Sequence, residues 1–358
     1  MIFRRKTKEV KLHQFSLGGI APIRVQSMTN TDTRDIASTI TQIKRLEDAG
    51  CEIVRLAVLN SEAAANLVAI RRSTEIALVA DIHFDYRLAL AAVQAGFDKL
   101  RLNPGNIGEA SRVRQVAHAA KEAGIPIRIG INSASLEKTL LAKYGAASPA
   151  AMVESALSHV QILEEENFEE ILVSLKAPDV ERTVEAYRLF SQTSAYPLHI
   201  GITHAGPPSN GIVNSAVGLG ILLAEGIGDT LRVSLTADPV LEVETGWRIL
   251  ESLAIRKRGV TLVSCPTCGR CQVDLASIVN EVEKLIADYR GYDITVAVMG
   301  CEVNGPGEAL EADLGLAAGQ GQGLIFKHGE VIAKVAPEHL LAVFKQELLK
   351  MIDEVKGV

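Results

Sequence analysis

A repeating unit runs through the first two-thirds of this chain of 358 residues. Each unit consists of a short β-rich run, a polar residue at its end and then a helical stretch. The predicted strands are Ile23–Ser27, Ile53–Ala57, Ala77–Asp81, Asp98–Leu102, Ile127–Ile131, Ile171–Leu175, Leu198–Ile202 and Leu231–Leu235. Eight strands that alternate with helices over about 250 residues favour an α/β fold of the TIM-barrel type, (β/α)8, over an open doubly wound sheet.

Helical patterns separate the strands, and glycines mark their ends. Gly50, Gly96 and Gly124 each follow a helix, at the position where a left-handed residue commonly terminates it. The predicted helices include Ile36–Ala49, Glu62–Arg72, Tyr86–Ala95, Glu109–Ala123 and Met152–Glu166.

A charged, glycine-ended stretch, Arg256–Gly259, predicts a boundary between two domains. The barrel is expected to span residues 1–255, and a small α+β domain is expected to span residues 259–358. The elements predicted for this second domain are strands at Val260–Ser264, Asp293–Met299, near Gly315, Gly323–Lys327 and Val331–Val335, and helices at Leu275–Ala287 and Glu338–Val355.

Polar side chains occupy the carboxyl ends of the predicted barrel strands, where such barrels build their reactive face. These residues are Gln26, Ser27, Arg55, Asp81, His83, Arg101, Asn103, Arg128, Asn132, Ser174, Lys176, His199, Thr203, His204, Arg232 and Ser234. One arginine at a strand end is usually explained by a salt bridge to a neighbouring loop. Four arginines and a lysine at one mouth repel one another, however, and need an anion to offset their charge. Because guanidinium groups bind phosphate oxygens in pairs, the sequence predicts a small ligand with more than one phosphate.

Three cysteines in the second domain predict a metal centre. Cys265 and Cys268 lie in S-C-P-T-C-G-R (264–270), and Cys301 lies in M-G-C-E-V-N-G-P-G-E (299–308). A Cys-x-x-Cys turn suits zinc or an iron–sulfur cluster, and the glycines around Cys301 allow close backbone approach to a bulky inorganic centre. Three thiolates from two turns therefore suggest a cluster rather than a disulfide.

The fourth ligand has two candidates on this pattern. Cys271 completes C-x-x-C-x-x-C, which resembles the ferredoxin run and makes it the first choice on spacing alone. Glu308, in the glycine-rich segment, is the other candidate. An alternative function is a phosphate-binding barrel joined to a purely structural zinc domain, with the metal held by Cys265, Cys268, Cys271 and Cys301.

Composition limits the compartment and the partners. The net charge of −6 gives no sign of nucleic-acid binding. Five cysteines, an odd number, fit a reducing environment, and the chain shows no signal peptide or membrane-spanning segment. We therefore expect a cytoplasmic protein without a membrane partner.

Several long motifs resemble those of the 4-hydroxy-3-methylbut-2-enyl diphosphate synthase family (IspG/GcpE) in its compact bacterial form. They are S-C-P-T-C-G-R, G-C-E-V-N-G-P-G-E-A (300–309), V-Q-S-M-T-N-T-D-T (25–33), R-L-N-P-G-N-I-G (101–108) and E-G-I-G-D-T-L-R-V-S-L (225–235). The resemblance extends from the first residues to the last domain.

The resemblance implies an oxidoreductase of the non-mevalonate (MEP) pathway of isoprenoid precursor synthesis. Its substrate would be 2-C-methyl-D-erythritol 2,4-cyclodiphosphate, which is opened reductively to 4-hydroxy-3-methylbut-2-enyl diphosphate. Two electrons would pass singly through a [4Fe-4S] cluster, from flavodoxin or ferredoxin. The family's ligand set implies that Cys265, Cys268, Cys301 and Glu308 hold this cluster, which favours Glu308 over Cys271.

The resemblance also assigns the barrel residues. The diphosphate would be clamped by Arg55, Arg101, Arg128, Lys176 and Arg232, with hydrogen bonds from Asn103, Asn132 and Ser234, in a pocket also lined by Asp81, His83 and His199. One position departs from the family pattern G-x-T-E-A-G, because this chain has G-I-T-H-A-G (201–206). Either His204 takes over the proton-handling role of the glutamate, or the rate or the substrate differs from the family norm.

A head-to-tail homodimer follows from the same resemblance, with each cluster domain closing over the barrel of its partner. The chain itself favours this arrangement. The link near Arg256–Gly259 is short, and it leaves from the end of the last barrel helix, which runs away from the mouth.

Overall fold

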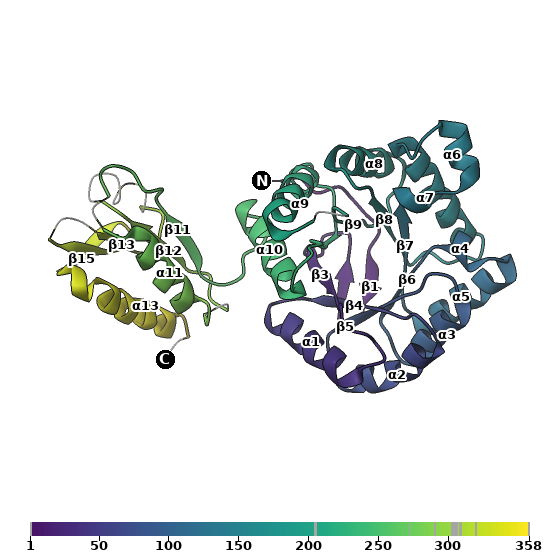
Figure 1. The fold of residues 1–358 in the computed structure, drawn as a ribbon, viewed down its shortest axis with the longest axis horizontal. Helices are drawn as coiled ribbons and strands as arrows, with labels where there is room; N and C mark the ends of the chain where they lie inside the picture. The colour runs from purple at the N-terminus through teal and green to yellow at the C-terminus, as the bar shows by residue number, and fades with distance from the viewer. Residues whose placement is uncertain are drawn as a thin grey trace. The chain divides into compact units, whose positions relative to one another are not determined.

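The chain divides into two compact units, residues 1–256 and 257–358 (Figure 1). The structure is a computed structural model, and it describes residues 2–203, 206–271, 273–289, 291–301, 307, 310–318 and 321–356.

Eight parallel strands form the barrel of the first unit. They are β3 (Arg24–Met28), β4 (Ile53–Ala57), β5 (Ala77–Asp81), β6 (Lys99–Leu102), β7 (Ile127–Asn132), β8 (Ile171–Lys176), β9 (His199–Ile200) and β10 (Thr230–Leu231). The first strand pairs with the last, since Arg24 lies opposite Thr230. Between β8 and β9 an isolated bridge from Val173 to Leu198 joins the ring. The predicted TIM-type barrel is therefore confirmed as a nearly closed ring.

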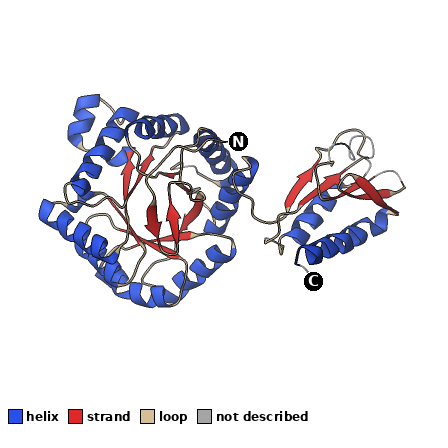
Figure 2. Cartoon of the chain, turned by 180° about the vertical axis from the view of Figure 1, so that it is seen from behind, coloured by secondary structure: helices blue, strands red, loops and turns tan. Residues whose placement is uncertain are grey.

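Helices surround the strands, as Figure 2 shows. They are α1 (Ile36–Asp48), α2 (Ser61–Arg72), α3 (Tyr86–Gln94), α4 (Pro104–Ile107), α5 (Ala110–Ala123), α6 (Lys138–Tyr144), α7 (Pro149–Glu164), α8 (Val180–Thr193), α9 (Pro208–Ala224) and α10 (Pro239–Ser252), with a short 3-10 turn at Ser133–Ser135. The side chains of Asp35 and Asn60 accept hydrogen bonds from the first turns of α1 and α2, which stabilises both starts. Gly124 ends α5 with a left-handed φ of 66°. None of the helices in the described ranges is long and apolar enough to cross a membrane.

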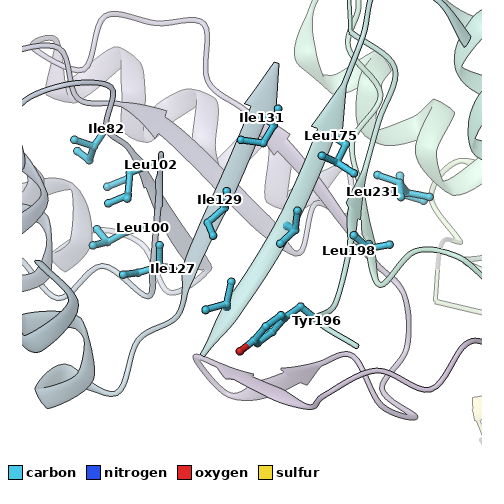
Figure 3. Packing of buried hydrophobic residues seen from close by; sticks show 14 of the residues in the cluster. Ile82, Leu100, Leu102, Ile127, Ile129, Ile131, Leu175, Tyr196, Leu198 and Leu231 are labelled. Atoms are coloured by element: carbon cyan, nitrogen blue, oxygen red, sulfur yellow. The ribbon is translucent and has the colours of Figure 1, made fainter. Parts of the chain in front are cut away.

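Alternation along the strands separates an apolar outer face from a polar interior. Leu100 and Leu102 of β6, and Ile127 and Ile129 of β7, are almost completely buried in the cluster between strands and helices (Figure 3). Because successive strand side chains point to opposite faces, the arginines between them, Arg101 and Arg128, face the inside of the barrel.

A short hairpin closes the amino-terminal end of the barrel. Its strands are β1 (Val10–Leu12) and β2 (Phe15–Leu17), which pair antiparallel. Their apolar side chains form a cluster, here called the floor cluster, with residues at the beginnings of β4, β5 and β8. Its members are Val10, Leu12, Leu17, Ile53, Ala77, Val79 and Leu172. The hairpin was not predicted from the sequence.

The second unit is a small α+β domain, as expected from the sequence. Its sheet contains, in order, β11 (Thr261–Ser264), β12 (Thr295–Met299), β13 (Leu314–Ala318), β14 (Gly323–Lys327) and β15 (Glu330–Val335). The first three strands are parallel and the last two are antiparallel to their neighbours. Two helices, α11 (Leu275–Ile286) and α13 (Leu340–Lys356), contribute Val282, Phe344 and Leu348 to the core against this sheet.

Candidate functional site

The five cations predicted at the strand ends lie together in the barrel. Arg55, Arg101, Arg128 and Lys176 come from β4, β6, β7 and β8, and Arg232 directly follows β10. The pKa of Lys176 is well below its ordinary value, first because its amino group is withdrawn from water and then because the four guanidinium groups are near enough to repel its charge. The side chains therefore form one cationic cluster.

Asp81, at the end of β5, is the acid at the centre of this cluster. Its carboxylate lies 3.1 Å from Arg101 Nη1 and 3.7 Å from Arg55 Nε. Burial alone raises the pKa of Asp81, but the attraction of Arg55 and Arg101 outweighs it and lowers the pKa to about 2. Asp81 is therefore ionised at neutral pH and holds both guanidinium groups in place.

Arg101 is oriented by its other neighbours. Its Nη2 donates to the carbonyl of Gly130 at 2.9 Å, and its Nη1 lies 3.3 Å from Nε2 of the exposed His83. A Cβ atom at position 130 would lie 2.4 Å from Arg101 Nε, so a larger residue there would displace the Arg101 guanidinium. Asn103 fixes the same segment, because its Oδ1 accepts a hydrogen bond from the Gly130 amide at 2.8 Å.

Arg128 and His199 lie deeper in the barrel. Arg128 is fully buried, and its three guanidinium nitrogens find no hydrogen-bond partner within the described part of the chain. His199 Nδ1 is 2.8 Å from Thr230 Oγ1, whereas its Nε2 is also without a partner in that part. Burial, followed by repulsion from Arg128 and Lys176, lowers the pKa of His199 well below its ordinary value, so the ring is neutral at neutral pH. Buried donors without acceptors are costly, and an anion would satisfy them.

The remaining predicted pocket residues lie at the same end of the barrel. Asn132 ends β7 and caps the following 3-10 turn, accepting a hydrogen bond from the Ala134 amide at 3.1 Å. Ser234 is half-buried three residues beyond the end of β10. His204 lies outside the described residues.

Two residues of this site were missed by the sequence analysis. Glu242 in α10 is buried and lies 3.2 Å from both Arg232 Nη2 and Nε, and it also accepts hydrogen bonds from Ser27 Oγ and the Leu235 amide. It stands on a helix, so a search of strand ends does not find it. Lys99 begins β6 and is fully buried. Lys99 is two residues before Arg101 on the same strand, so the alternation of side chains places both inside the barrel. This alternation could have revealed Lys99 from the sequence.

The cysteines of the second unit lie where two neighbouring strands end. Cys265 directly follows β11, Cys301 follows β12 after Gly300, and Ser264 lies opposite Val298 in the parallel pair. The Gly300 amide donates to Cys265 Sγ at 3.2 Å. The five cysteines, all of them in the described ranges, form no disulfide.

Cys271 also lies beside this turn. A Cβ atom on Gly300 would lie 2.7 Å from Cys271 Sγ, so a larger residue there would displace the Cys271 side chain. The Cys271 amide donates to the carbonyl of the exposed Cys268 at 2.9 Å, and its thiol donates to the Val273 carbonyl at 3.4 Å.

This arrangement suits an iron–sulfur cluster. Such clusters are bound by cysteine thiolates, and backbone amides donate hydrogen bonds to their sulfur atoms. The His, Cys, Asp and Glu residues in the described ranges contain no preassembled group of three or more that could hold a metal ion. Glu308, the predicted fourth ligand, lies outside those ranges.

A groove of about 280 Å³ lies elsewhere, between α9 and α10 on the outside of the barrel. Its lining is mainly apolar and includes Ile212, Ala216 and Leu241. It lacks the converging cations of the barrel interior, so the barrel interior is the candidate anion site.

Both units match models of protein domain families. Residues 7–247 match the GcpE TIM-barrel domain, and residues 261–350 match the GcpE protein C-terminal domain.

Full-length relatives share more than half of their residues with this chain. It is similar to the 4-hydroxy-3-methylbut-2-en-1-yl diphosphate synthase (flavodoxin) of Geobacter sulfurreducens, with 56% identity over 351 residues, or 98% of this chain and 99% of that protein. The protein of the same name from Maridesulfovibrio salexigens is 55% identical over 360 residues, which cover all of both chains.

Solved structures of dihydropteroate synthases resemble the barrel. The enzyme from Coxiella burnetii matches with a TM-score of 0.51 and 11% identity, covering 69% of this chain and 97% of that one. The enzyme from Yersinia pestis matches with a TM-score of 0.50 and 12% identity, covering 69% and 98%. At such low identity the likeness shows the fold alone.

Proposed function

Because the chain belongs to the GcpE family of 4-hydroxy-3-methylbut-2-en-1-yl diphosphate synthases, we propose that it is the oxidoreductase that opens 2-C-methyl-D-erythritol 2,4-cyclodiphosphate to 4-hydroxy-3-methylbut-2-enyl diphosphate. The reaction consumes two electrons and two protons and releases one water. It belongs to the MEP pathway of isoprenoid synthesis.

One observation carries the assignment of the substrate site. Arg55, Arg101, Arg128, Lys176 and Arg232 lie together in the barrel, and the carboxylates among them, Asp81 and Glu242, are fewer. This excess positive charge calls for a ligand with several negative charges, and a diphosphate group supplies them. We propose that Asn103, Asn132 and Ser234 form hydrogen bonds with the diphosphate. His83 and His199 would line the wall of the pocket.

The cysteines of the second unit would hold the cofactor. We propose that Cys265, Cys268, Cys301 and Glu308 are the ligands of a [4Fe-4S] cluster, which supplies electrons one at a time when bound. The Gly300 amide, 3.2 Å from Cys265 Sγ, would stabilise the negative charge on this sulfur. His204 would donate a proton, in place of the glutamate found in the family pattern.

The electron donor and the assembly are further parts of the proposal. The names of the relatives from Geobacter sulfurreducens and Maridesulfovibrio salexigens include flavodoxin, and we propose flavodoxin or ferredoxin as the donor for this chain. We propose a head-to-tail homodimer in the cytoplasm, where reducing conditions keep the cysteines as thiols.

Anaerobic reconstitution tests the function. Protein supplied with iron, sulfide, reduced flavodoxin and the cyclodiphosphate should form the open-chain diphosphate, detected by mass spectrometry, and should contain about four iron and four sulfide per chain. Cys301→Ser is the matched control and should lose both iron and product. A colourless protein that binds zinc and forms no product would contradict the proposal.

The same assay distinguishes the two candidates for the fourth ligand. Glu308→Ala should lose iron or activity, because it removes a ligand. Cys271→Ser should keep both, although Cys271 Sγ lies beside Gly300. The opposite result would assign the fourth position to Cys271.

A further inference from the structure

Lys99 lies two residues before Arg101 on β6, nearer the beginning of the strand and the floor cluster. Lys99 of β6 lies in register with Val79 of β5, and Val79 lies in register with Arg55 of β4. Val79 belongs to the floor cluster, whose apolar side chains come from the hairpin and the strand beginnings. Lys99 therefore occupies the boundary between the sealed end of the barrel and the candidate anion pocket.

The Lys99 amino group has no acceptor. It is fully buried, and its Nζ makes no hydrogen bond to any residue that the structure describes. Gln26, on β3, is also buried, and neither polar atom of its side chain has a partner in the same set of residues. Buried polar atoms without protein partners mark places that a polar ligand or water would fill.

The charges that act on Lys99 are almost all positive. Arg128 from β7, Arg55 from β4 and His199 from β9 are its titratable or charged neighbours inside the barrel. Asp98 precedes Lys99 in the chain, but its carboxylate is bound to Arg71 Nη1, His13 Nδ1 and the Leu78 amide. Asp81 on β5 is likewise bound by Arg101 and Arg55.

These surroundings favour the uncharged amine. Burial first, and then repulsion from Arg128 and Arg55, lowers the pKa of Lys99 well below its ordinary value. Arginine cannot respond in this way because its guanidinium stays protonated, whereas lysine gains or loses its proton readily when its surroundings change. An anion bound beside Lys99 would reverse the balance of charge around its amino group.

We propose that Lys99 forms the bottom of the diphosphate pocket and takes up a proton from solvent when a diphosphate binds. The neutral amine becomes an ammonium ion that donates to the anion, so the pocket adds positive charge only when it is filled. This inference rests on the proposed function, since it requires that the barrel bind a diphosphate. It makes Lys99 a binding residue whose charge depends on occupancy.

Calorimetry with inorganic pyrophosphate, without divalent cations, tests the proposal on the full-length protein. Titrations at one pH in buffers of different ionisation enthalpy give the number of protons taken up per ligand bound. The unmutated protein should take up protons, and Lys99→Met should take up about one fewer per site and bind pyrophosphate more weakly. Any protons contributed by pyrophosphate itself cancel in this difference. Lys143→Met removes an exposed lysine that pairs with Glu154 and is the matched control; it should behave like the unmutated protein.

A second measurement does not depend on the variant being folded. With lysine labelled at the ε carbon, the buried Lys99 resonance of the unmutated protein should move from the amine to the ammonium position when pyrophosphate is added. An equal proton uptake in Lys99→Met and the unmutated protein, or an unchanged Lys99 resonance with pyrophosphate bound, would overturn the inference and leave the proposed function standing. Failure of pyrophosphate to bind the unmutated protein would count against both.

Discussion

At the scale of the residue, the barrel interior contains buried donors whose energetic cost a bound anion would offset. Arg128 is fully buried, and all three nitrogens of its guanidinium lack partners in the described part of the protein. Asp81 and Glu242 bind three of the other arginines, so little negative charge is left for Arg128. A buried cation in this state destabilises the empty protein, while the same donors strengthen the binding of a phosphate.

Arg128→Met should therefore change stability and binding in opposite directions. The substitution removes unsatisfied buried donors, so the free energy of unfolding of the ligand-free protein should rise by about 1–3 kcal/mol. The lost charge-assisted bonds should weaken substrate binding by roughly 1.5–3 kcal/mol each, or about tenfold or more. Thermal unfolding with and without pyrophosphate, together with KM, measures both effects. Arg114→Met, at an exposed arginine paired with Glu166, should change neither. A less stable empty protein would show that water or other groups already satisfy Arg128.

At the scale of the element, the strand–helix repeat was sufficient to predict the barrel because aliphatic runs and glycine helix ends are local signals. Two predicted strands, Leu198–Ile202 and Leu231–Leu235, are shorter in the structure, as His199–Ile200 and Thr230–Leu231. Beyond the ladder, a Cβ atom on Gly201 would lie 2.7 Å from the Arg232 carbonyl, a close approach that hydrophobic pattern does not reveal.

The site residues that lie on predicted strands or at their ends could be predicted from the sequence, and those that lie elsewhere could not. The arginines on β4, β6 and β7 follow from strand alternation, and so their meeting in the barrel could be expected. Glu242 contacts Arg232 from a helix, and the hairpin has strands of only three residues beside a charged amino-terminal segment. The distant contacts are those of Glu242 with Ser27 and of the hairpin with the beginnings of β4, β5 and β8, and local periodicity does not record them.

The hairpin should contribute stability without contributing to binding. Leu12 is almost completely buried in the floor cluster, so Leu12→Ala should lower the free energy of unfolding by about 2–5 kcal/mol. Lys11, the exposed neighbour in the same strand, provides the control Lys11→Ala, which should stay within about 0.5 kcal/mol of the parent. Denaturant unfolding measures both. Pyrophosphate affinity of the folded Leu12→Ala protein should be unchanged, and a large loss would mean that the floor also shapes the anion pocket.

At the scale of the whole molecule, the two candidate sites belong to different compact units. The cations lie in residues 1–256, and the cysteines lie in residues 257–358. The proposed reaction requires both at one substrate, so one unit must meet the other either within a chain or between two chains.

Mixing two inactive variants distinguishes these possibilities. Cys301→Ser should abolish the cofactor site, and Arg128→Met should impair the substrate site. If the active site is shared between chains, verified heterodimers should regain about one working site of the two in a symmetric pair. Each variant mixed with itself is the control and should stay inactive or impaired. Heterodimers without recovered turnover would place both halves of the site in a single chain.

The floor cluster restricts how a ligand could enter and leave the barrel. Because the hairpin covers the amino-terminal end of the barrel, a diphosphate bound among the arginines as proposed would enter and leave at the carboxyl ends of the strands. In that arrangement the charged diphosphate would lie deepest in the barrel, and the carbon skeleton would lie nearest the opening. Substrate and product would use the same opening, so each product would have to leave before the next substrate could bind.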